Sequence, residues 1–107
     1  MNMYKVKWTL SAVKDLDEII DYIAQDSVQI ALKQYQKIKE SAQTLCSFPE
    51  KGRIIPELQN QNIYKFRELI INPWRLMHKI DGNKVYVLAL IDGRRNIEDI
   101  LLNRQLR

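Results

Sequence analysis

The stretch from Tyr64 to Arg95 constrains the fold most, because strand-like runs and turn residues alternate along it. Asn72-Pro73 interrupts the pattern once, and Asp81-Gly82-Asn83 interrupts it again with a glycine that tolerates the positive φ of a hairpin turn. The last run is nearly all apolar, which is typical of a central strand covered on both faces. We therefore predict a three-stranded antiparallel meander, with strands at residues 64–71, 74–80 and 85–91.

A short strand and two amphipathic helices are predicted before the meander. Apolar and basic residues alternate over Met3–Trp8, which is the period of a half-buried strand. Thr9 or Ser11 can serve as the N-cap of the first helix, and Ser27 can cap the second, which is predicted to run to about Ser47. The predicted buried stripes are Val13, Leu16, Ile20 and Ile23 in the first helix, and Ala31, Tyr35, Ile38, Ala42 and Leu45 in the second.

The order of these elements predicts the fold class. Residues 50–62 are predicted to form a loop, and Asn96 can cap a short final helix. Each long helix has one apolar stripe to bury, so both helices must cover one face of a mainly antiparallel sheet. We predict a single α+β domain over residues 1–107: an N-terminal strand, an antiparallel helical hairpin packed on the sheet, and a short C-terminal helix. The first strand can pair at an edge or parallel to the last strand.

Composition excludes several classes of protein. One cysteine and one histidine cannot supply a disulfide framework or a usual zinc set, so we expect no metal and no other cofactor. The histidine, His78, alternates with apolar residues and is predicted to pack within the sheet. No apolar run approaches the length of a membrane span, and the N-terminus has no apolar signal region, so a cytoplasmic protein is expected. The net charge of +4 is compatible with a nucleic-acid partner or an acidic protein partner.

Four arginines are spaced through the predicted meander. Guanidinium groups on a rigid sheet can form a site for phosphate or carboxylate, because each offers a planar fork of donors. Arg94 and Arg95 follow a glycine at a strand end, where functional side chains often project. Arg67 alternates with a phenylalanine, and it is compatible both with a solvated strand position and with a functional one.

Structural ion pairs compete with function at two charged positions. Arg75 follows a tryptophan, and in this pattern an arginine more often ties strands to a nearby carboxylate such as Glu68 or Glu57. Glu57 can likewise hold its loop in place through a salt bridge to Arg53 or Arg67.

Several motifs, taken together and in order, resemble the RelE/ParE superfamily, the toxins of type II toxin–antitoxin systems. They are Trp8-Thr9-Leu10-Ser11-Ala12, Tyr22-Ile23-Ala24, Phe48-Pro49, Gly52-Arg53, Pro56-Glu57-Leu58, Phe66-Arg67-Glu68-Leu69, Trp74-Arg75-Leu76-Met77-His78, Val87-Leu88-Ala89-Leu90 and Gly93-Arg94-Arg95. The match covers most of the chain. The resemblance implies a small basic toxin that is neutralised by an antitoxin encoded beside it.

The resemblance also implies functional residues. Members of the RelE and YoeB branches are ribosome-dependent mRNA endonucleases, and Arg67 and Arg95, or its neighbour Arg94, lie where they carry phosphate-binding arginines. Glu57 resembles the general base of YoeB-like members. The implied catalytic set of a nuclease is Glu57, Arg67 and Arg95, and the implied target- or phosphate-binding set is Arg53, Arg67, Arg75, Arg94 and Arg95.

The general acid of these nucleases has no counterpart in the sequence. The tyrosine of RelE-like enzymes aligns with Leu101, and the histidine of YoeB-like enzymes aligns with Asp92-Gly93-Arg94. An aspartate with an ordinary pKa is ionised at neutral pH and donates protons poorly. These empty positions favour the ParE branch, whose members resemble the nucleases but poison DNA gyrase.

We therefore expect a ParE-like, non-hydrolytic inhibitor of DNA gyrase with a cognate antitoxin. Such an antitoxin wraps a disordered, acidic and apolar segment around its toxin, which gives a toxin–antitoxin hetero-oligomer. One alternative is a RelE-like, metal-independent mRNA endonuclease that acts at the ribosome. A further alternative is an inactive homologue that only binds its antitoxin and regulates transcription with it.

Overall fold

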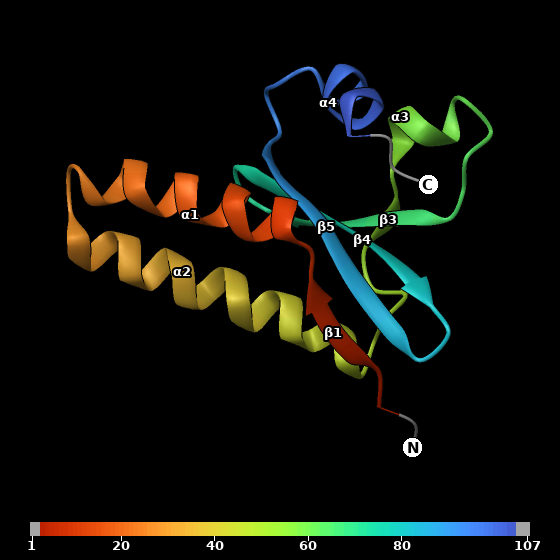
Figure 1. Cartoon of the computed structure of the whole chain (residues 1–107), viewed down its shortest axis with the longest axis horizontal. Helices are drawn as coiled ribbons and strands as arrows, with labels where there is room; N and C mark the ends of the chain where they lie inside the picture. Colours follow the sequence, from red (N-terminus) through yellow and green to blue (C-terminus); the bar gives the residue numbers. More distant parts are fainter. Residues whose placement is uncertain (1–2, 105–107) are drawn as a thin grey trace.

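The computed structural model describes residues 3–104, which form a five-stranded sheet with helices against it (Figure 1). The strands are β1 (Lys5–Trp8), β2 (Arg53–Ile54), β3 (Phe66–Ile71), β4 (Trp74–Asp81) and β5 (Lys84–Asp92). The helices are α1 (Leu10–Ala24), α2 (Val28–Gln43), α3 (Pro56–Gln59) and α4 (Ile97–Asn103), and a 3₁₀ turn, Thr44–Cys46, follows α2. The predicted α+β architecture is confirmed.

The strand order is β1-β5-β4-β3-β2, and it contains the predicted meander. β3, β4 and β5 are antiparallel neighbours, while β1 lies at an edge and pairs in parallel with β5. Both options that the sequence left open for the first strand therefore apply together. β5 is internal, and all its residues from 85 to 91 are buried except the half-buried Tyr86, as its apolar composition predicted.

The prediction of a loop over residues 50–62 was wrong, because this segment contains β2 and α3. Arg53 and Ile54 pair with β3, and Ile55 is fully buried. Pro56 then begins α3, since the fixed φ of proline suits the first helical position and its missing N–H costs nothing there. Proline and glycine mark turns and helix starts alike, so their presence in the sequence did not distinguish the two.

The predicted helical hairpin is present, and hydroxyl side chains cap both helices. The backbone N–H groups of Ala12 and Ile30 donate to the Oγ atoms of Thr9 and Ser27, each at 3.2 Å. α2 ends at Gln43, earlier than predicted, because the chain tightens there into the 3₁₀ turn. Two members of the predicted stripes, Val13 and Tyr35, are each 40% exposed and lie at the margins of the interface. The buried centre comprises Ala12, Leu16, Ile38, Ala42 and Leu45, packed on Leu69, Ile71, Leu76, Val85, Val87 and Leu90.

α3 and α4 cover part of the opposite face of the sheet (Figure 1). Ile97 and Leu101 of α4 pack there with Leu58 of α3 in a second apolar cluster. Asn96 caps α4 as predicted, because its Oδ1 accepts the backbone N–H of Asp99 at 3.3 Å. The sheet therefore has apolar cores on both faces, and the second core extends over only part of its face.

His78 is fully buried in β4, as the sequence predicted. Its Nε2 lies 3.1 Å from the carbonyl oxygen of Pro49, and its Nδ1 has no hydrogen-bond partner among the described residues. Burial, with a further contribution from the nearby Arg67 cation, lowers the pKa of this imidazole from its ordinary value. His78 thus joins the sheet to the segment that follows α2 while remaining neutral.

The buried histidine predicts a stability that depends on pH. The folded-state pKa of His78 is lowered, so the free energy of unfolding should be highest above the unfolded-state pKa of about 6.5 and should fall as the pH drops below it. The slope approaches at most about 1.4 kcal/mol per pH unit, the value for one proton. Urea unfolding between about pH 8 and pH 5.5 measures this. A His78→Gln variant keeps an N–H donor but has nothing to titrate, so an equally steep profile in that variant would refute the assignment.

Candidate functional site

Arg75 lies at the centre of a buried ion-pair network that joins four elements. From β4 its Nε donates to Oε1 of Glu68 in β3 at 2.6 Å, and its Nη2 donates to Oε2 of the same carboxylate at 2.9 Å. Its Nη1 and Nη2 also donate to both oxygens of Glu57 in α3, at 2.8 and 2.7 Å. Arg53 of β2 donates from Nε to Oε2 of Glu68 at 2.8 Å. The structural interpretation of Arg75 therefore has direct geometric support.

This network leaves Glu57 poorly suited to take a proton. The sequence indicated Arg53, Arg67 or Arg75 as its salt-bridge partner, and the structure pairs both its oxygens with Arg75. These hydrogen bonds lower the pKa of Glu57, against the opposing effect of its partial burial. A carboxylate with a lowered pKa is a weaker base.

Asp92 and Arg94 form an exposed pair just after β5. The guanidinium of Arg94 donates to both carboxylate oxygens of Asp92, at 3.0 and 2.6 Å, and the backbone N–H of Arg94 donates at 2.9 Å. These bonds lower the pKa of Asp92 to about 2, so the carboxylate is ionised at neutral pH. Leu101, the other position aligned with a general acid, is buried in the α4 core. Neither position can donate a proton at neutral pH.

The predicted arginines do not converge on one site. Arg53, Arg75 and Arg94 line a hollow of about 340 Å³ beside the turn between β3 and β4. Arg94 and Arg95 line a second hollow of about 360 Å³. Arg67 lies elsewhere, opposite the buried His78 in register and with Nη1 3.5 Å from the carbonyl oxygen of Gly52.

The alternation of side chains along the strands explains this separation. Leu69, which packs under the helical hairpin, is two residues from Arg67, so both project from the same sheet face. Glu68 projects from the opposite face, where Arg75 reaches it. Arg67 and Arg75 therefore lie on opposite faces of the sheet.

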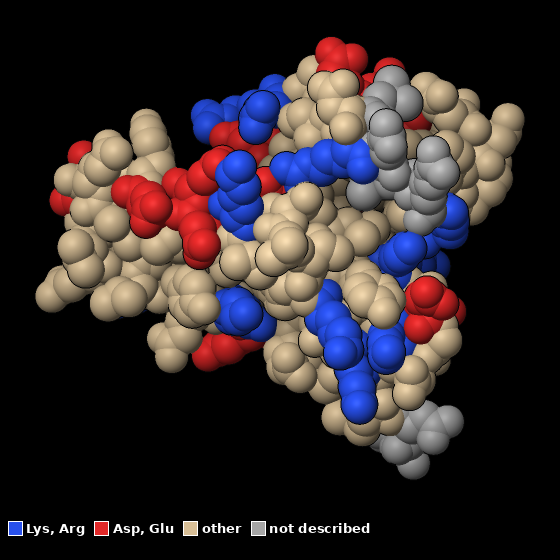
Figure 2. Space-filling view, in the orientation of Figure 1, with Lys and Arg blue, Asp and Glu red and all other residues tan. Residues whose placement is uncertain are grey.

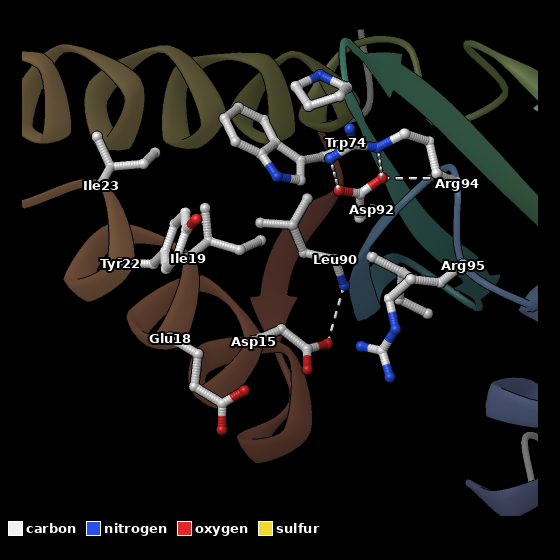
Figure 3. Close-up of a pocket in the computed structure, with 12 residues that line it drawn as sticks. Asp15, Glu18, Ile19, Tyr22, Ile23, Trp74, Leu90, Asp92, Arg94 and Arg95 are labelled. Atoms are coloured by element: carbon white, nitrogen blue, oxygen red, sulfur yellow. Dashed lines mark hydrogen bonds and ion pairs between the residues drawn. The ribbon is translucent and has the colours of Figure 1, made fainter.

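The second hollow is a groove between α1 and the end of β5, which we call the α1–β5 groove (Figure 3). Ile19 and Tyr22 project into it from α1 and face Trp74 and Leu90 across it (Figure 3). Charged residues of both signs surround these apolar side chains. They are Asp15, Glu18, Asp92, Arg94 and Arg95.

Sequence reasoning identified the arginines of this groove but not Tyr22, which is 72% exposed. Tyr22 belongs to a motif of the resemblance, and an aromatic residue outside the apolar stripe of a helix was the available signal. The sequence also missed Asp15, which accepts the backbone N–H of Leu90 at 2.9 Å and the guanidinium of Arg104 at 2.7 and 2.5 Å. Asp15 thus holds the part of β5 beyond its pairing with β1, and Arg104 just after α4, against α1.

Residues 3–104 hold no cluster of three or more metal-ligating side chains in the structure. None of the helices in that part of the chain is long and apolar enough to cross a membrane. The described residues form two hollows lined by arginines, and these do not bring Glu57, Arg67 and Arg95 together.

The helical hairpin, the mainly antiparallel sheet and the arginine-lined groove define a small basic α+β protein of the RelE/ParE kind. Residues 6–97 match the model of the family described as the ParE toxin of the type II toxin-antitoxin system, parDE, and the chain belongs to this family. It is accordingly a toxin of the ParE/RelE kind.

Individual relatives agree with this assignment. Toxin ParE3 of Caulobacter vibrioides is 29% identical over 84 residues, which are 78% of this chain and 80% of the relative. Toxin RelE2 of the same bacterium is 35% identical over 94 residues, which are 87% of this chain and 99% of the relative. A solved structure described as the chromosomal ParDE TA system from P. aeruginosa is similar with a TM-score of 0.69 and 26% identity, over 86% of this chain and 98% of that one.

Proposed function

We propose that the protein is a ParE-like toxin that inhibits DNA gyrase by binding and not by hydrolysis. The observation that carries the proposal is that arginines hold both carboxylates at the positions implied for the general base and the general acid. Glu57 is held by Arg75, and Asp92 is held ionised by Arg94. Cleavage of RNA by its own 2′-hydroxyl needs a base that can take a proton and an acid that can give one.

We further propose that a cognate antitoxin covers the α1–β5 groove and forms a toxin–antitoxin hetero-oligomer in the cytoplasm. The similarity to a ParDE structure supports such a partner. The groove combines exposed apolar side chains, such as Tyr22, with the cation of Arg95, while Arg94 already pairs with Asp92. An acidic and apolar segment that folds on binding would match both properties.

Purified protein added to a gyrase supercoiling reaction tests the target directly. Supercoiling should be inhibited, and induced expression should arrest growth with broken DNA and intact mRNA. The alternative outcome is codon-phased mRNA cuts that vanish in Arg67→Ala, with gyrase unaffected. Expression without growth arrest would instead indicate the inactive homologue.

A Glu57→Gln variant separates the two active candidates quantitatively. If the toxin acts by binding, growth arrest and gyrase inhibition should persist at nearly the original toxin dose, because Glu68 still pairs with Arg75 and the new amide oxygen can still accept a hydrogen bond from it. If Glu57 is a general base, activity should fall by about 10²–10⁴-fold. Circular dichroism and a urea melt confirm that the variant is folded. A loss of that size with the fold intact would refute the binding mechanism.

The RelE-like mRNA endonuclease remains the second candidate. The identity of 35% to Toxin RelE2 over nearly its full length supports it. In that case Arg67 and Arg95 would have to reach the same phosphate, which the separation of their positions disfavours. Primer extension on ribosome-bound mRNA is the direct assay.

A further inference from the structure

The strand register brings three lysines together on the sheet face that α3 and α4 leave partly open. Lys5 of β1 pairs with Lys84 of β5, and Lys7 pairs with Tyr86. Directly paired residues project from the same face of a sheet. Tyr86 packs against the α3–α4 cluster, which identifies that face as the one opposite the helical hairpin. We call Lys5, Lys7 and Lys84 the lysine face.

The three lysines form no salt bridge with a carboxylate of the described residues 3–104. Lys5 and Lys7 are exposed and Lys84 is half-buried, and none of the three forms an ion pair in that part of the chain. Asp81 lies opposite Lys84 in register without forming a salt bridge to it. Three like charges held side by side favour an anionic partner.

Figure 2 shows a group of basic side chains over β1 and the β4–β5 hairpin, and acidic side chains over α1 with basic ones among them. The exposed acids of α1 include Asp17, Glu18 and Asp21. A polyanion that approaches β1 and the β4–β5 hairpin meets fewer carboxylates than one that approaches α1.

We propose that the lysine face binds the phosphate backbone of duplex DNA. Ammonium groups are compact point charges that contact phosphates without reading base edges. Along a strand alternate lysines are about 6.8 Å apart, and neighbouring strands are about 4.8 Å apart. Duplex DNA carries one charge per about 1.7 Å of its axis, so its high charge density attracts three amines held this close together.

The aromatic residues on this part of the sheet distinguish a duplex from a single strand. Proteins that bind single strands stack the bases on exposed aromatic rings. Here the Phe66 ring is buried, and Tyr86 is half-buried with the Lys79 ammonium 6.0 Å from its ring centroid. The bases of a duplex are already stacked on one another, so they need no such rings.

This proposal goes beyond gyrase inhibition and does not depend on it. Gyrase acts on duplex DNA, so a toxin with its own affinity for the duplex would be concentrated where gyrase works. The contact would add no sequence preference, because it involves phosphates alone.

Fluorescence anisotropy with a labelled duplex of about 20 base pairs tests the proposal with the intact chain. Three phosphate contacts predict a slope of about −2.7 in log K against log salt, or about 40-fold weaker binding between 50 and 200 mM salt. The triple variant Lys5→Gln, Lys7→Gln, Lys84→Gln should lose this slope. The matched control is Lys14→Gln, Lys33→Gln, Lys37→Gln, which removes the same charge from exposed helix positions and should keep the same slope.

Asp81→Asn provides an independent gain-of-binding test, because it removes a negative charge opposite Lys84. Its affinity for the duplex should rise severalfold at low salt, and urea melts should show all variants folded. Equal losses in both triple variants would refute a localised face. Tighter binding of single-stranded RNA or of polyglutamate than of the duplex would refute the assigned partner. The supercoiling assay on the same variants separates the two proposals. Gyrase inhibition can be lost while DNA binding persists, and DNA binding can be lost while gyrase inhibition persists.

Discussion

Replacing Glu68 with alanine is expected to lower the free energy of unfolding by about 3–5 kcal/mol. Glu68 is fully buried, and its two oxygens accept bonds from Arg75 and Arg53 at 2.6 to 2.9 Å. Without this carboxylate, the buried Arg75 would keep Glu57 but would have no acceptor for its Nε. A buried cation that loses one of its two carboxylates, and the only acceptor of its Nε, is left incompletely compensated, so the loss is larger than for a typical substitution.

Urea unfolding followed by circular dichroism measures this loss. Arg53→Gln is the control, because it removes the other partner of Glu68 from a position whose side chain is 56% exposed and should cost about 0–1 kcal/mol. The double variant Glu68→Leu, Arg75→Leu should be less destabilised than the sum of its two single changes. In the double variant both charges of the pair are removed together, so neither one remains buried without the other. A Glu68→Ala loss no larger than that of Arg53→Gln would contradict the central position of the carboxylate.

Gly52→Ala is expected to cost about 3 kcal/mol or more, because two penalties add at this position. Gly52 has a φ of +91°, a left-handed conformation that costs an L residue about 1–2 kcal/mol. An added Cβ would also lie 2.1 Å from the backbone oxygen of Glu68. β2 would have to move away from β3, and Arg53, the next residue, would lose its hold on Glu68.

Gly82→Ala isolates the first of these penalties. Gly82 has a φ of +62°, but an added Cβ would meet nothing within 4 Å, so the expected loss is about 1 kcal/mol. Urea unfolding gives both values. Amide hydrogen exchange then shows whether Ile54 and the facing strand lose protection in Gly52→Ala alone. Equal losses of unfolding free energy in the two variants would show that the close approach of β2 to β3 does not exclude a Cβ at position 52.

The ion pair between Arg75 and Glu68 was predictable because it is local. A short turn joins β3 to β4, and it fixes Glu68 opposite Met77, two residues from Arg75 on the same sheet face. Diagonal neighbours at this spacing are within reach of a long side chain. The packed position of His78 followed from the same alternation along β4.

The distribution of the other arginines was not predictable. A shift of one residue along a strand moves a side chain to the other face of the sheet. This alternation places Arg67 and Arg75 on opposite faces, which could not be read from their presence in the same segment. Arg94 turns back to its near neighbour Asp92, which depends on backbone geometry after β5. The number of arginines in a segment therefore overstated the number available to a ligand.

The lysine face depends on contacts that are remote in sequence. Lys5 and Lys84 are at nearly opposite ends of the chain, and only the parallel pairing of β1 with β5 places them together. The sequence left the placement of β1 open, so it could not assign these residues to one surface. Local periodicity predicts elements, whereas a surface of this kind requires the register between distant elements.

The parallel pairing of β1 with β5 also bears on the order of events during synthesis. A ribosome releases the chain from its N-terminus, so Lys5–Trp8 emerges long before its partner Lys84–Asp92. The helical hairpin and the early part of the meander can form first, but the edge strand must wait until β5 has been made. A nascent chain of this topology can complete neither its sheet nor the α1–β5 groove until residues 84–95 have left the ribosome.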